Sequence, residues 1–529
     1  MKRSTRLILS GSSGILLSLA WLDFPGWILF AAFLPLLVLD DFFVKEKKQF
    51  RSVAFWGHTY LVFLIWNGLT TWWVWHATPF GAVLVIFLNS FLMSLTWWLA
   101  HIARRNLPGN LGYLALVTFW LSFEFFHFHW EIEWPWLTLG NGFANNIKLI
   151  QWYEYTGTLG GSLWILVVNI LLFKILHKFV QGGALKSEPA GMILLAILVF
   201  FPIGYSLFSY STQKEQTNPR KILIIQPNID PYNESHNETG AYQAMDKFIS
   251  LVNDNFTDSI HYIVGPETVF EQNWDEEKLN EYPQFFKIKE IVEFNKGTNL
   301  VIGASTYRIY HPGETVPGTA RVMRDGTRFD RYNSSVFVTS GSPEQVYHKS
   351  ILVSGVEKMP YRKYLKIFEK FIINLGGTYG SLGIQKSPTN FRAPDGTLIA
   401  VPICYESVFG GYLTEFVRNG ANLIFIITND GWWKNTPGYR QHLSFARLRA
   451  IETRRSIARS ANTGISCFIN QRGEILQKTS WWQDGALTGN LNASDKITFY
   501  VRYGDYIARI SLYISGLILL YMLGLRFRK

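Results

Sequence analysis

The sequence predicts a multi-pass α-helical membrane bundle of about eight spans, joined to an extracytoplasmic α/β domain. Long apolar runs cluster before residue 211 and recur once near the C-terminus, whereas short β-rich runs alternate with helical stretches between residues 220 and 470. Of the 529 residues, 48% are hydrophobic and 17% charged. An average soluble domain has about 25% charged residues, so this composition favours a membrane protein.

The expected spans are apolar runs, several of which can cross a hydrocarbon core of about 30 Å at a helical rise of about 1.5 Å per residue. The first two runs are short and are separated by Asp23, Phe24 and Pro25, so we expect a hairpin there. A cleaved signal peptide is an alternative for the first run, but no small-residue cleavage site follows it. The spans are expected at residues 6–22, 26–40, 53–76, 80–101, 111–130, 161–180, 190–210 and 506–525.

Basic residues are distributed unevenly between the loops. If the N-terminus lies inside, the inside segments carry nearly all of the loop Lys and Arg, and Lys148 is the only basic residue of the short outside loops. We therefore expect a bundle of seven spans at 1–210, an outer domain at 211–504, and a last span with a cytoplasmic tail at 505–529. Much of the net charge of +11 then reflects topology, which removes the main support for nucleic-acid binding.

Within the outer domain, continuous apolar runs predict buried strands, and the helical stretches between them predict an α/β fold. Ligand sites in such folds lie at the carboxyl ends of strands. The expected strands are Ile222–Ile225, Tyr262–Val264, Leu300–Ile302, Ser335–Val338, Leu398–Ile403, Leu423–Ile427 and Ile465–Ile469. The expected helices are Thr239–Asn253, Phe285–Asn295, Gly410–Arg418 and Gln441–Arg459.

Three chemically competent residues stand after these strands: Glu267, Lys349 and Cys404. A thiolate is a strong nucleophile, and a helix start and a nearby ammonium would both favour it at Cys404. Glu267 could accept the thiol proton as general base, and Lys349 could stabilise the oxyanion formed when a carbonyl is attacked. Taken singly, each residue has an ordinary structural explanation, such as a buried core cysteine. Their shared position favours a covalent acyl-transfer site without a metal.

The motifs around these residues resemble those of the nitrilase (carbon–nitrogen hydrolase) superfamily. They are Gly265-Pro266-Glu267-Thr268, Tyr347-His348-Lys349, Cys404-Tyr405-Glu406 and Thr428-Asn429-Asp430-Gly431-Trp432-Trp433. In combination with the eight-span block, they are similar to the apolipoprotein N-acyltransferase family. The sequence departs from that family at Pro227, where Gly is usual, and at Ser354-Gly355-Val356, where Pro-Phe-Gly is usual. These departures affect substrate-lid details rather than the chemistry.

The resemblance implies an αββα sandwich for the outer domain and a monomeric enzyme of the bacterial inner membrane, with that domain on the periplasmic side. It implies that Cys404 takes the sn-1 acyl chain of a phospholipid as a thioester and passes it to the amine of a diacylglyceryl-cysteine in an apolipoprotein. Glu267 would be the base and Lys349 the oxyanion stabiliser. Glu357 and Glu406 would support Lys349, and Tyr405 would line the site. No cofactor is implied.

Several other residues are functional candidates. Cys467 lies in an apolar strand and is expected in the core, although a disulfide with Cys404 is an alternative. Glu124 is expected to pair inside the bundle, and His127 and His129 are unsuited to a metal site on one helix face. The arginines between 440 and 459 predict a solvated or salt-bridged helix face, with phospholipid head groups as the alternative. Candidate lids, from their aromatic content, are Glu271–Tyr282 and Glu357–Gly380.

Two other classes of function remain open at this point. The same Glu, Lys and Cys would serve a membrane-anchored amidase or nitrilase that hydrolyses a small amide. A transporter or receptor with a large outer domain would not need them, and it would keep its function when Cys404 is replaced by Ala.

Overall fold

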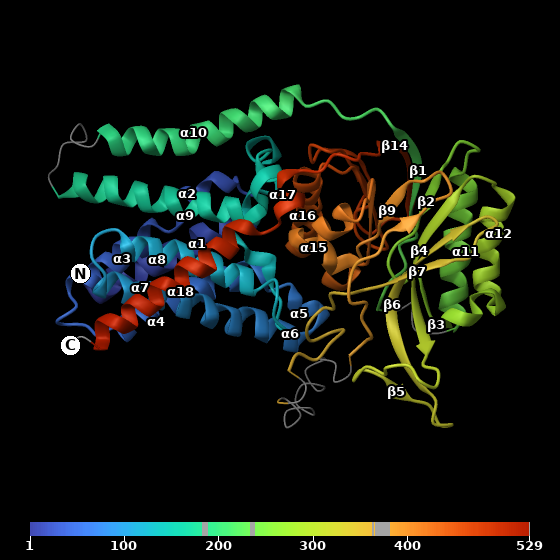
Figure 1. Ribbon diagram of the computed structural model, residues 1–529, viewed down its shortest axis with the longest axis horizontal. Coiled ribbons are helices and arrows are strands. Elements are labelled where there is room, and N and C mark those ends of the chain that lie inside the picture. Colours follow the sequence, from blue (N-terminus) through green and yellow to red (C-terminus); the bar gives the residue numbers. More distant parts are fainter. Residues whose placement is uncertain (182–188, 233–237, 362–363, 365–380, 528–529) are drawn as a thin grey trace. The chain divides into compact units, whose positions relative to one another are not determined.

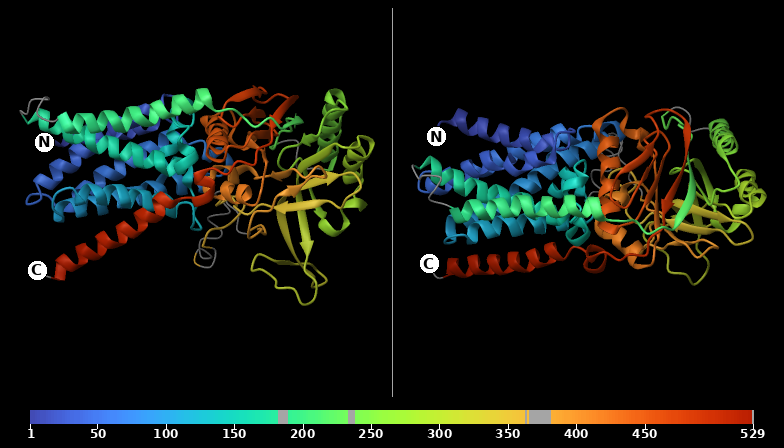
Figure 2. Two further views of the ribbon diagram at one scale, coloured as in Figure 1. Left: turned by 45° about the horizontal axis from the view of Figure 1, so that its top comes forward. Right: turned by 90° about the horizontal axis from the view of Figure 1, so that it is seen from above.

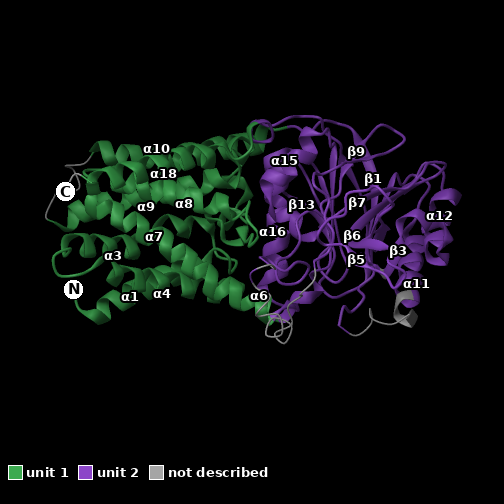
Figure 3. Ribbon diagram, turned by 60° about the horizontal axis from the view of Figure 1, so that its bottom comes forward, with its two compact units in different colours: residues 1–75, 79–213, 503–529 green, residues 76–78, 214–502 purple. Residues whose placement is uncertain are grey.

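The computed structural model describes residues 1–181, 189–232, 238–361, 364 and 381–527. The chain divides into two compact units, coloured separately in Figure 3. Unit 1 comprises Met1–Trp75, Pro79–Gln213 and Tyr503–Lys529, and unit 2 comprises His76–Thr78 and Lys214–Arg502.

Unit 1 is built from helices, the longer of which run side by side in both views of Figure 2. Helix α1 packs on α4, α4 on α7, α7 on α8, and α8 on α18. Apolar residues cover most of the helix surfaces, and Trp66, Trp97 and Trp120 are fully buried among them. The helices are α1 (Arg3–Leu19), α2 (Leu29–Ala32), α3 (Leu34–Lys45), α4 (Ser52–Thr71), α5 (Val74–Ala77), α6 (Pro79–Val83), α7 (Asn89–Asn106), α8 (Leu111–Phe126), α9 (Tyr153–Val180), α10 (Pro189–Thr212) and α18 (Tyr506–Phe527).

Five helical segments of the described chain are long and apolar enough to cross a membrane. The expectation that several apolar helices span a membrane is therefore confirmed. The five segments are Gly26–Lys45, Pro79–Asn106, Tyr153–Val180, Pro189–Thr212 and Tyr506–Phe527. The other three expected spans correspond to α1, α4 and α8. Helices α1 and α8 have only 17 and 16 residues, and α4 carries His58 and Asn67. The number of eight spans therefore stays a prediction.

Glu124 of α8 lies buried inside unit 1. Its Oε1 atom accepts hydrogen bonds from the indole of Trp120 at 2.9 Å and from the main-chain amide of Leu139 at 2.8 Å. These two donors satisfy one carboxylate oxygen, so the side chain ties α8 to the segment that follows it. Helix α8 ends at Phe126, so His127 and His129 lie beyond the helix. Within the described residues, no group of three or more His, Cys, Asp or Glu is arranged to hold a metal ion.

Unit 2 contains two β-sheets with helices on their outer faces (Figure 1). The first sheet has the order β14-β1-β2-β4-β6-β5, with β3 paired to β4 and β7 to β6, and the second has the order β13-β12-β11-β10-β9-β8. The strands of the first sheet are β1 (Pro219–Gln226), β2 (Tyr262–Val264), β3 (Phe270–Asp275), β4 (Asn299–Ile309), β5 (Arg321–Val322), β6 (Arg328–Thr339), β7 (Gln345–His348) and β14 (Gly485–Asn492). Those of the second are β8 (Phe391–Arg392), β9 (Leu398–Ala400), β10 (Leu423–Thr428), β11 (Ile457–Ala461), β12 (Cys467–Ile469) and β13 (Ile475–Lys478).

Side chains that alternate along each strand of the first sheet enter two different cores. Ile222 and Ile224 of β1 pack with Phe425 of the second sheet, whereas Leu223 and Ile225 pack beneath the outer helices. The helices beside the first sheet are α11 (Glu238–Asn255) and α12 (Pro283–Phe294), and those beside the second are α15 (Gly410–Arg418) and α16 (Pro437–Thr453). A short helix, α17 (Phe499–Tyr503), ends the unit. This layering confirms the expected αββα sandwich.

The expected helix Gln441–Arg459 is wrong at its C-terminal end. Helix α16 ends at Thr453, and Arg454 adopts a left-handed conformation with φ of 50°. The chain then turns into β11, which pairs in parallel with β10. The central parallel strands agree with the sequence, since β2 covers Tyr262–Val264 and β10 covers Leu423–Thr428.

Candidate active site

Glu267 lies three residues beyond β2, in a loop pressed against β4. The amide of Gly303 in β4 donates to the carbonyl of Pro266 at 3.0 Å, and the amide of Val269 donates to the carbonyl of Gly303 at 3.2 Å. A Cβ atom at residue 303 would lie 2.6 Å from the Cα of Glu267. Glycine at this position therefore allows the loop to turn the Glu267 side chain into the interior, where it is buried.

Lys349 directly follows β7, and its amide donates to the carbonyl of Asn333 in β6 at 2.8 Å. Its side chain is buried, and its Nζ atom contacts Oε1 of Glu267 at 3.1 Å and Oε1 of Glu357 at 2.8 Å. A buried ammonium needs such partners, because burial of an unpaired charge is costly. The structure thus brings Glu267, Lys349 and Glu357 together, from three separate segments of the sequence.

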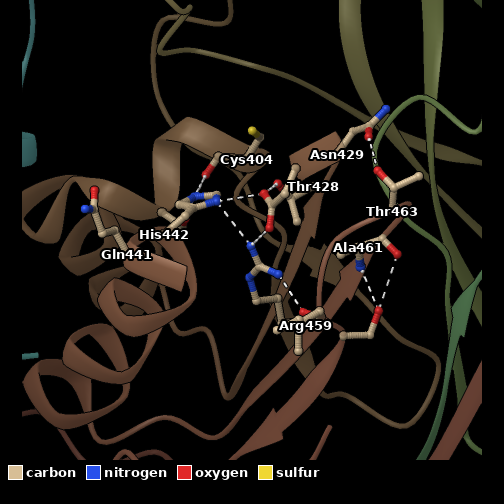
Figure 4. A network of polar contacts seen from close by, with 12 residues as sticks. Cys404, Thr428, Asn429, Gln441, His442, Arg459, Ala461 and Thr463 are labelled. Atoms are coloured by element: carbon tan, nitrogen blue, oxygen red, sulfur yellow. Dashed lines mark hydrogen bonds and ion pairs between the residues drawn. The ribbon is translucent and has the colours of Figure 1, made fainter. Parts of the chain in front are cut away.

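Cys404 begins a 3-10 helix, η9 (Cys404–Val408), just after β9, and it is buried. Its φ angle of 50° is in the left-handed region, which is uncommon for residues other than glycine. In Figure 4 its sulfur points away from the ring of His442, whereas its carbonyl points toward that ring. The charges of Glu267 and Lys349 both act on this thiol, so the three sequence-predicted residues share one buried site.

The charges of this site favour a protonated thiol. Burial raises the pKa of Cys404, the carboxylate of Glu267 raises it further, and the ammonium of Lys349 offsets only part of the rise, so the pKa lies well above its ordinary value. Burial by itself lowers the pKa of Lys349, but Glu267 and Glu357 outweigh it and hold that pKa well above its ordinary value. The ammonium of Lys349 favours the thiolate, as expected, but desolvation of the sulfur outweighs it.

Glu406 connects the segments that carry Lys349 and Cys404. Its Oε1 atom accepts from the amide of Ser350 at 2.6 Å and from the hydroxyl of Tyr347 at 2.8 Å, and its Oε2 atom accepts from the amide of Ile403 at 2.7 Å. Burial raises the pKa of Glu406 to about 7 against these hydrogen bonds. Glu406 therefore holds the main chain beside both residues, whereas Glu357 contacts the lysine ammonium itself.

Tyr405 is buried, and its ring packs edge-on against Phe409 at 5.1 Å between centroids. This contact is within the same short turn of chain that presents Cys404. The ring of Tyr405 is therefore held by Phe409 within the turn that carries Cys404.

Two further residues at the site were not predicted from the sequence. The side-chain amide of Asn333, in β6, donates to Glu267 at 2.7 Å and to Glu357 at 3.0 Å. The main-chain amide of Asn429, after β10, donates to the other oxygen of Glu267 at 3.0 Å. Asn429 belongs to a motif that follows an expected strand, so the sequence could have indicated its place at the site. Asn333 lies within a strand, and nothing in the sequence around it indicates a functional residue. Both donors fix the orientation of the Glu267 carboxylate.

Most of the arginines between 440 and 459 are internal, and two of them form ion pairs, as the salt-bridged alternative predicts. Arg440 is exposed and Arg447 is half-buried. Arg449, Arg454, Arg455 and Arg459 are buried, so these four form neither a solvated helix face nor a surface for lipid head groups, and Arg449 pairs with Glu452 at 3.1 Å. Arg455 donates to the carbonyl of Ala421 at 2.6 Å, and Arg459 contacts Asp430 at 2.6 Å. They serve as internal hydrogen-bond donors between α16, β11 and the neighbouring loops.

The structure also describes the two cysteines and part of the two candidate lids. Cys467 is a free, fully buried residue of the core between the sheets, as expected, and Cys404 is free as well. The segment Glu271–Tyr282 was expected as a lid from its aromatic content, but it forms the end of β3 and a 3-10 helix, and Trp274 is fully buried in the core. The second candidate lid, Glu357–Gly380, lies mostly outside the described residues.

Comparisons with known proteins agree with this architecture. Residues 13–171 match the apolipoprotein N-acyltransferase N-terminal domain, and residues 295–497 match the carbon–nitrogen hydrolase domain. The apolipoprotein N-acyltransferase of Chlorobaculum tepidum is 28% identical, over 96% of this chain and 95% of its own length. The enzymes of that name from Geobacter metallireducens and Thermotoga maritima are 26% and 25% identical, over 94% and 96% of this chain and 91% and 92% of their own lengths.

Solved structures with some likeness include an amidase from Nesterenkonia sp. AN1 and a glutamine-dependent NAD+ synthetase from Acinetobacter baumannii. The amidase is 14% identical with a TM-score of 0.35, over 55% of this chain and 98% of its own. The synthetase is 16% identical with a TM-score of 0.35, over 52% of this chain and 45% of its own. At these TM-scores, no conclusion about this chain is drawn from the two structures.

The apolar helices and the carbon–nitrogen hydrolase domain occur in one chain, and the relatives match both parts together. The chain is thus a membrane protein similar over nearly its whole length to the apolipoprotein N-acyltransferases, and it is an enzyme of the N-acyltransferase class.

Proposed function

We propose that this enzyme transfers the sn-1 acyl chain of a phospholipid, through a thioester on Cys404, to the N-terminal amine of a diacylglyceryl-cysteine in an apolipoprotein. The observation that carries the proposal is the buried contact between Lys349 and Glu267 at 3.1 Å, together with the Cys404 thiol, whose pKa is shifted by the charges of both residues. This is a base, a cation and a nucleophile in one site.

In the first step, the sulfur of Cys404 attacks the ester carbonyl carbon while Glu267 accepts the thiol proton. A carboxylate base is needed because the resting thiol is protonated. The ammonium of Lys349 stabilises the oxyanion of the tetrahedral intermediate. The intermediate then breaks its bond to the glycerol oxygen, which takes the proton from Glu267, so that a lysophospholipid leaves and a thioester remains.

In the second step, the amine of the acceptor attacks the thioester carbonyl and Glu267 accepts a proton from the amine. Lys349 again stabilises the oxyanion. The thiolate leaves and is reprotonated by Glu267, which restores the starting enzyme and gives an amide on the acceptor. Glu357 acts by holding Lys349, and Glu406 by holding the main chain on either side of the site.

The membrane helices suit these substrates, because both carry acyl chains anchored in a bilayer. Transfer of an acyl chain into water would cost about 0.8 kcal/mol for each exposed CH2 group. A catalytic unit tethered by its own spans avoids that cost. We propose that the enzyme acts as a monomer in the bacterial inner membrane with unit 2 on the periplasmic side, an orientation supported by the asymmetry of loop charge.

The test uses the full-length enzyme in detergent micelles with a phospholipid labelled separately at the sn-1 or sn-2 chain. The acceptor is a synthetic diacylglyceryl-cysteine peptide with a free α-amine. We expect the sn-1 label to appear as an amide on the peptide, together with lysophospholipid, and Cys404→Ser to abolish both products. Release of free fatty acid without peptide acylation, or turnover of small amides alone, would instead support the amidohydrolase alternative.

A further inference from the structure

Cys404 holds a backbone conformation that its own side chain does not favour. Its φ angle of 50° lies in the left-handed region, so neighbouring groups must hold it there. On its N-terminal side, the amide of Ile403 donates to Glu406 at 2.7 Å. The conformation decides where the sulfur points, and the contacts on the C-terminal side of Cys404 therefore bear on its reactivity.

The carbonyl oxygen of Cys404 is held by two side chains, of which Figure 4 labels His442. The hydroxyl of Ser407 donates to it at 2.7 Å, and Nε2 of His442 lies 3.2 Å from it. Nε2 also lies 3.0 Å from the Ser407 oxygen. Since the Ser407 hydrogen is directed to the carbonyl, Nε2 faces two acceptors and must carry a hydrogen of its own.

His442 is in turn held by a buried ionic group. Its Nδ1 atom lies 3.0 Å from Oδ1 of Asp430, and Oδ2 of Asp430 contacts Arg459 at 2.6 Å. All three side chains are nearly or fully buried. The hydroxyl of Thr428 donates to Asp430 at 2.9 Å and also contacts the Cys404 thiol. The carboxylate of Asp430 thus fixes the imidazole on one side and, through Thr428, reaches the sulfur on the other.

We propose that His442 is a positioning residue, which Asp430 and Arg459 orient so that its Nε2 hydrogen holds the Cys404 carbonyl and keeps the nucleophile in its left-handed conformation. This inference rests on the proposed function, since it assigns a role in that reaction. The ring of His442 contacts the carbonyl of Cys404, and the sulfur points away from it in Figure 4. His442 acts through the main chain of Cys404, which sets the direction of the thiol toward Glu267 and Lys349.

Two amide variants separate this role from general packing. His442→Gln places an amide nitrogen near the position of Nε2, where it can donate to the Cys404 carbonyl. His442→Asn places one near Nδ1, where it can contact Asp430 but not reach the carbonyl. The asparagine and glutamine side chains are polar and no larger than histidine. Thermal unfolding of the two full-length variants therefore shows whether a difference in activity comes from a difference in stability.

We expect His442→Gln to keep kcat within about tenfold of the wild type, and His442→Asn to lose about 100-fold in kcat with KM changed less than about threefold, because a misdirected nucleophile loses its attack geometry. The rate at which iodoacetamide alkylates Cys404, measured by peptide mapping, should separate the variants in the same order. Equal rates for both variants, or higher activity for His442→Asn, would overturn the proposal.

The alkylation measurement uses no lipid, so it distinguishes the two claims. If the wild type transfers no acyl chain but the two variants still differ in alkylation, the proposed function fails and the positioning role stands. If the wild type transfers acyl chains and the variants match each other in both measurements, the positioning role fails alone.

Discussion

Around Cys404, the same carboxylate that must act as base also opposes ionisation of the thiol at rest. Burial is the larger cause of the raised pKa of Cys404, and the negative charge of Glu267 adds to it. In the proposed mechanism, this arrangement keeps the sulfur protonated until Glu267 accepts its proton. Reactivity toward substrate and reactivity toward a simple alkylating reagent should therefore respond differently to the loss of that charge.

We expect Glu267→Gln to lower acyl transfer by about 10²- to 10⁴-fold, the usual contribution of a general base. The same change should speed alkylation of Cys404 by iodoacetamide at pH 8, because the pKa of the thiol falls when the carboxylate charge is lost. Peptide mapping at several pH values measures the second effect. A parallel loss of both rates would show that Glu267 supports the local structure and does not raise the pKa of the thiol.

Glu406 should make stability depend on pH. Its pKa is about 7 in the folded chain against 4.5 for an ordinary carboxyl, so the folded state binds more protons between these values. The stabilisation it gives is therefore complete below about pH 4.5 and is lost as the pH rises through 7. In Glu406→Gln, the midpoint of thermal unfolding should change less between pH 5 and pH 7 than in the wild type. Equal pH dependence in the two proteins would contradict this assignment.

Among the elements, β4 approaches the Glu267 loop so closely that the contact positions the site. A Cβ atom at residue 303 would stand 2.6 Å from Pro266 O, Glu267 Cα and Thr268 N. These are backbone atoms, so they cannot move aside cheaply. We expect Gly303→Ala to destabilise the full-length protein by about 1–3 kcal/mol and to lower activity by displacing Glu267.

Gly485→Ala is the matched control for that change, because a Cβ at residue 485 meets nothing within 4 Å and residue 485 also lies in a strand of the same sheet. Thermal unfolding and acyl transfer of the two variants provide the measurement. If Gly303→Ala behaves as Gly485→Ala does, the close packing of β4 against the loop does not position Glu267.

The elements that carry Glu267 and Cys404 could be predicted from the sequence, because buried parallel strands leave continuous apolar runs and their carboxyl ends are easily located. β11 could not be predicted, since Arg459 at its centre is an arginine in a strand that is buried throughout. Tertiary contacts compensate for that burial, since Arg459 contacts Asp430 at 2.6 Å and donates to the carbonyl of Ile465 at 2.7 Å. Asn333 was missed for a similar reason, because its partners come from distant segments.

At the scale of the whole chain, the proposed mechanism requires unit 2 to face the outer side of the membrane. Both native cysteines are free and buried, and Cys404→Ser removes the reactive one, so a surface cysteine added to that variant can be labelled selectively. We expect Val322→Cys, at an exposed position of unit 2, to react with a membrane-impermeant maleimide in intact spheroplasts. Lys47→Cys, in the exposed segment between α3 and α4, should react only after permeabilisation. The reverse pattern would contradict the orientation.

The covalent intermediate is the central claim, and intact-mass spectrometry of the full-length enzyme tests it most directly. After incubation with a single defined phospholipid and no acceptor, we expect a mass increase of one acyl group on Cys404, which neutral hydroxylamine removes and which the Cys404→Ser variant lacks. Addition of a diacylglyceryl-cysteine peptide should discharge it. An unmodified Cys404 in an enzyme that nevertheless acylates the peptide would contradict the account.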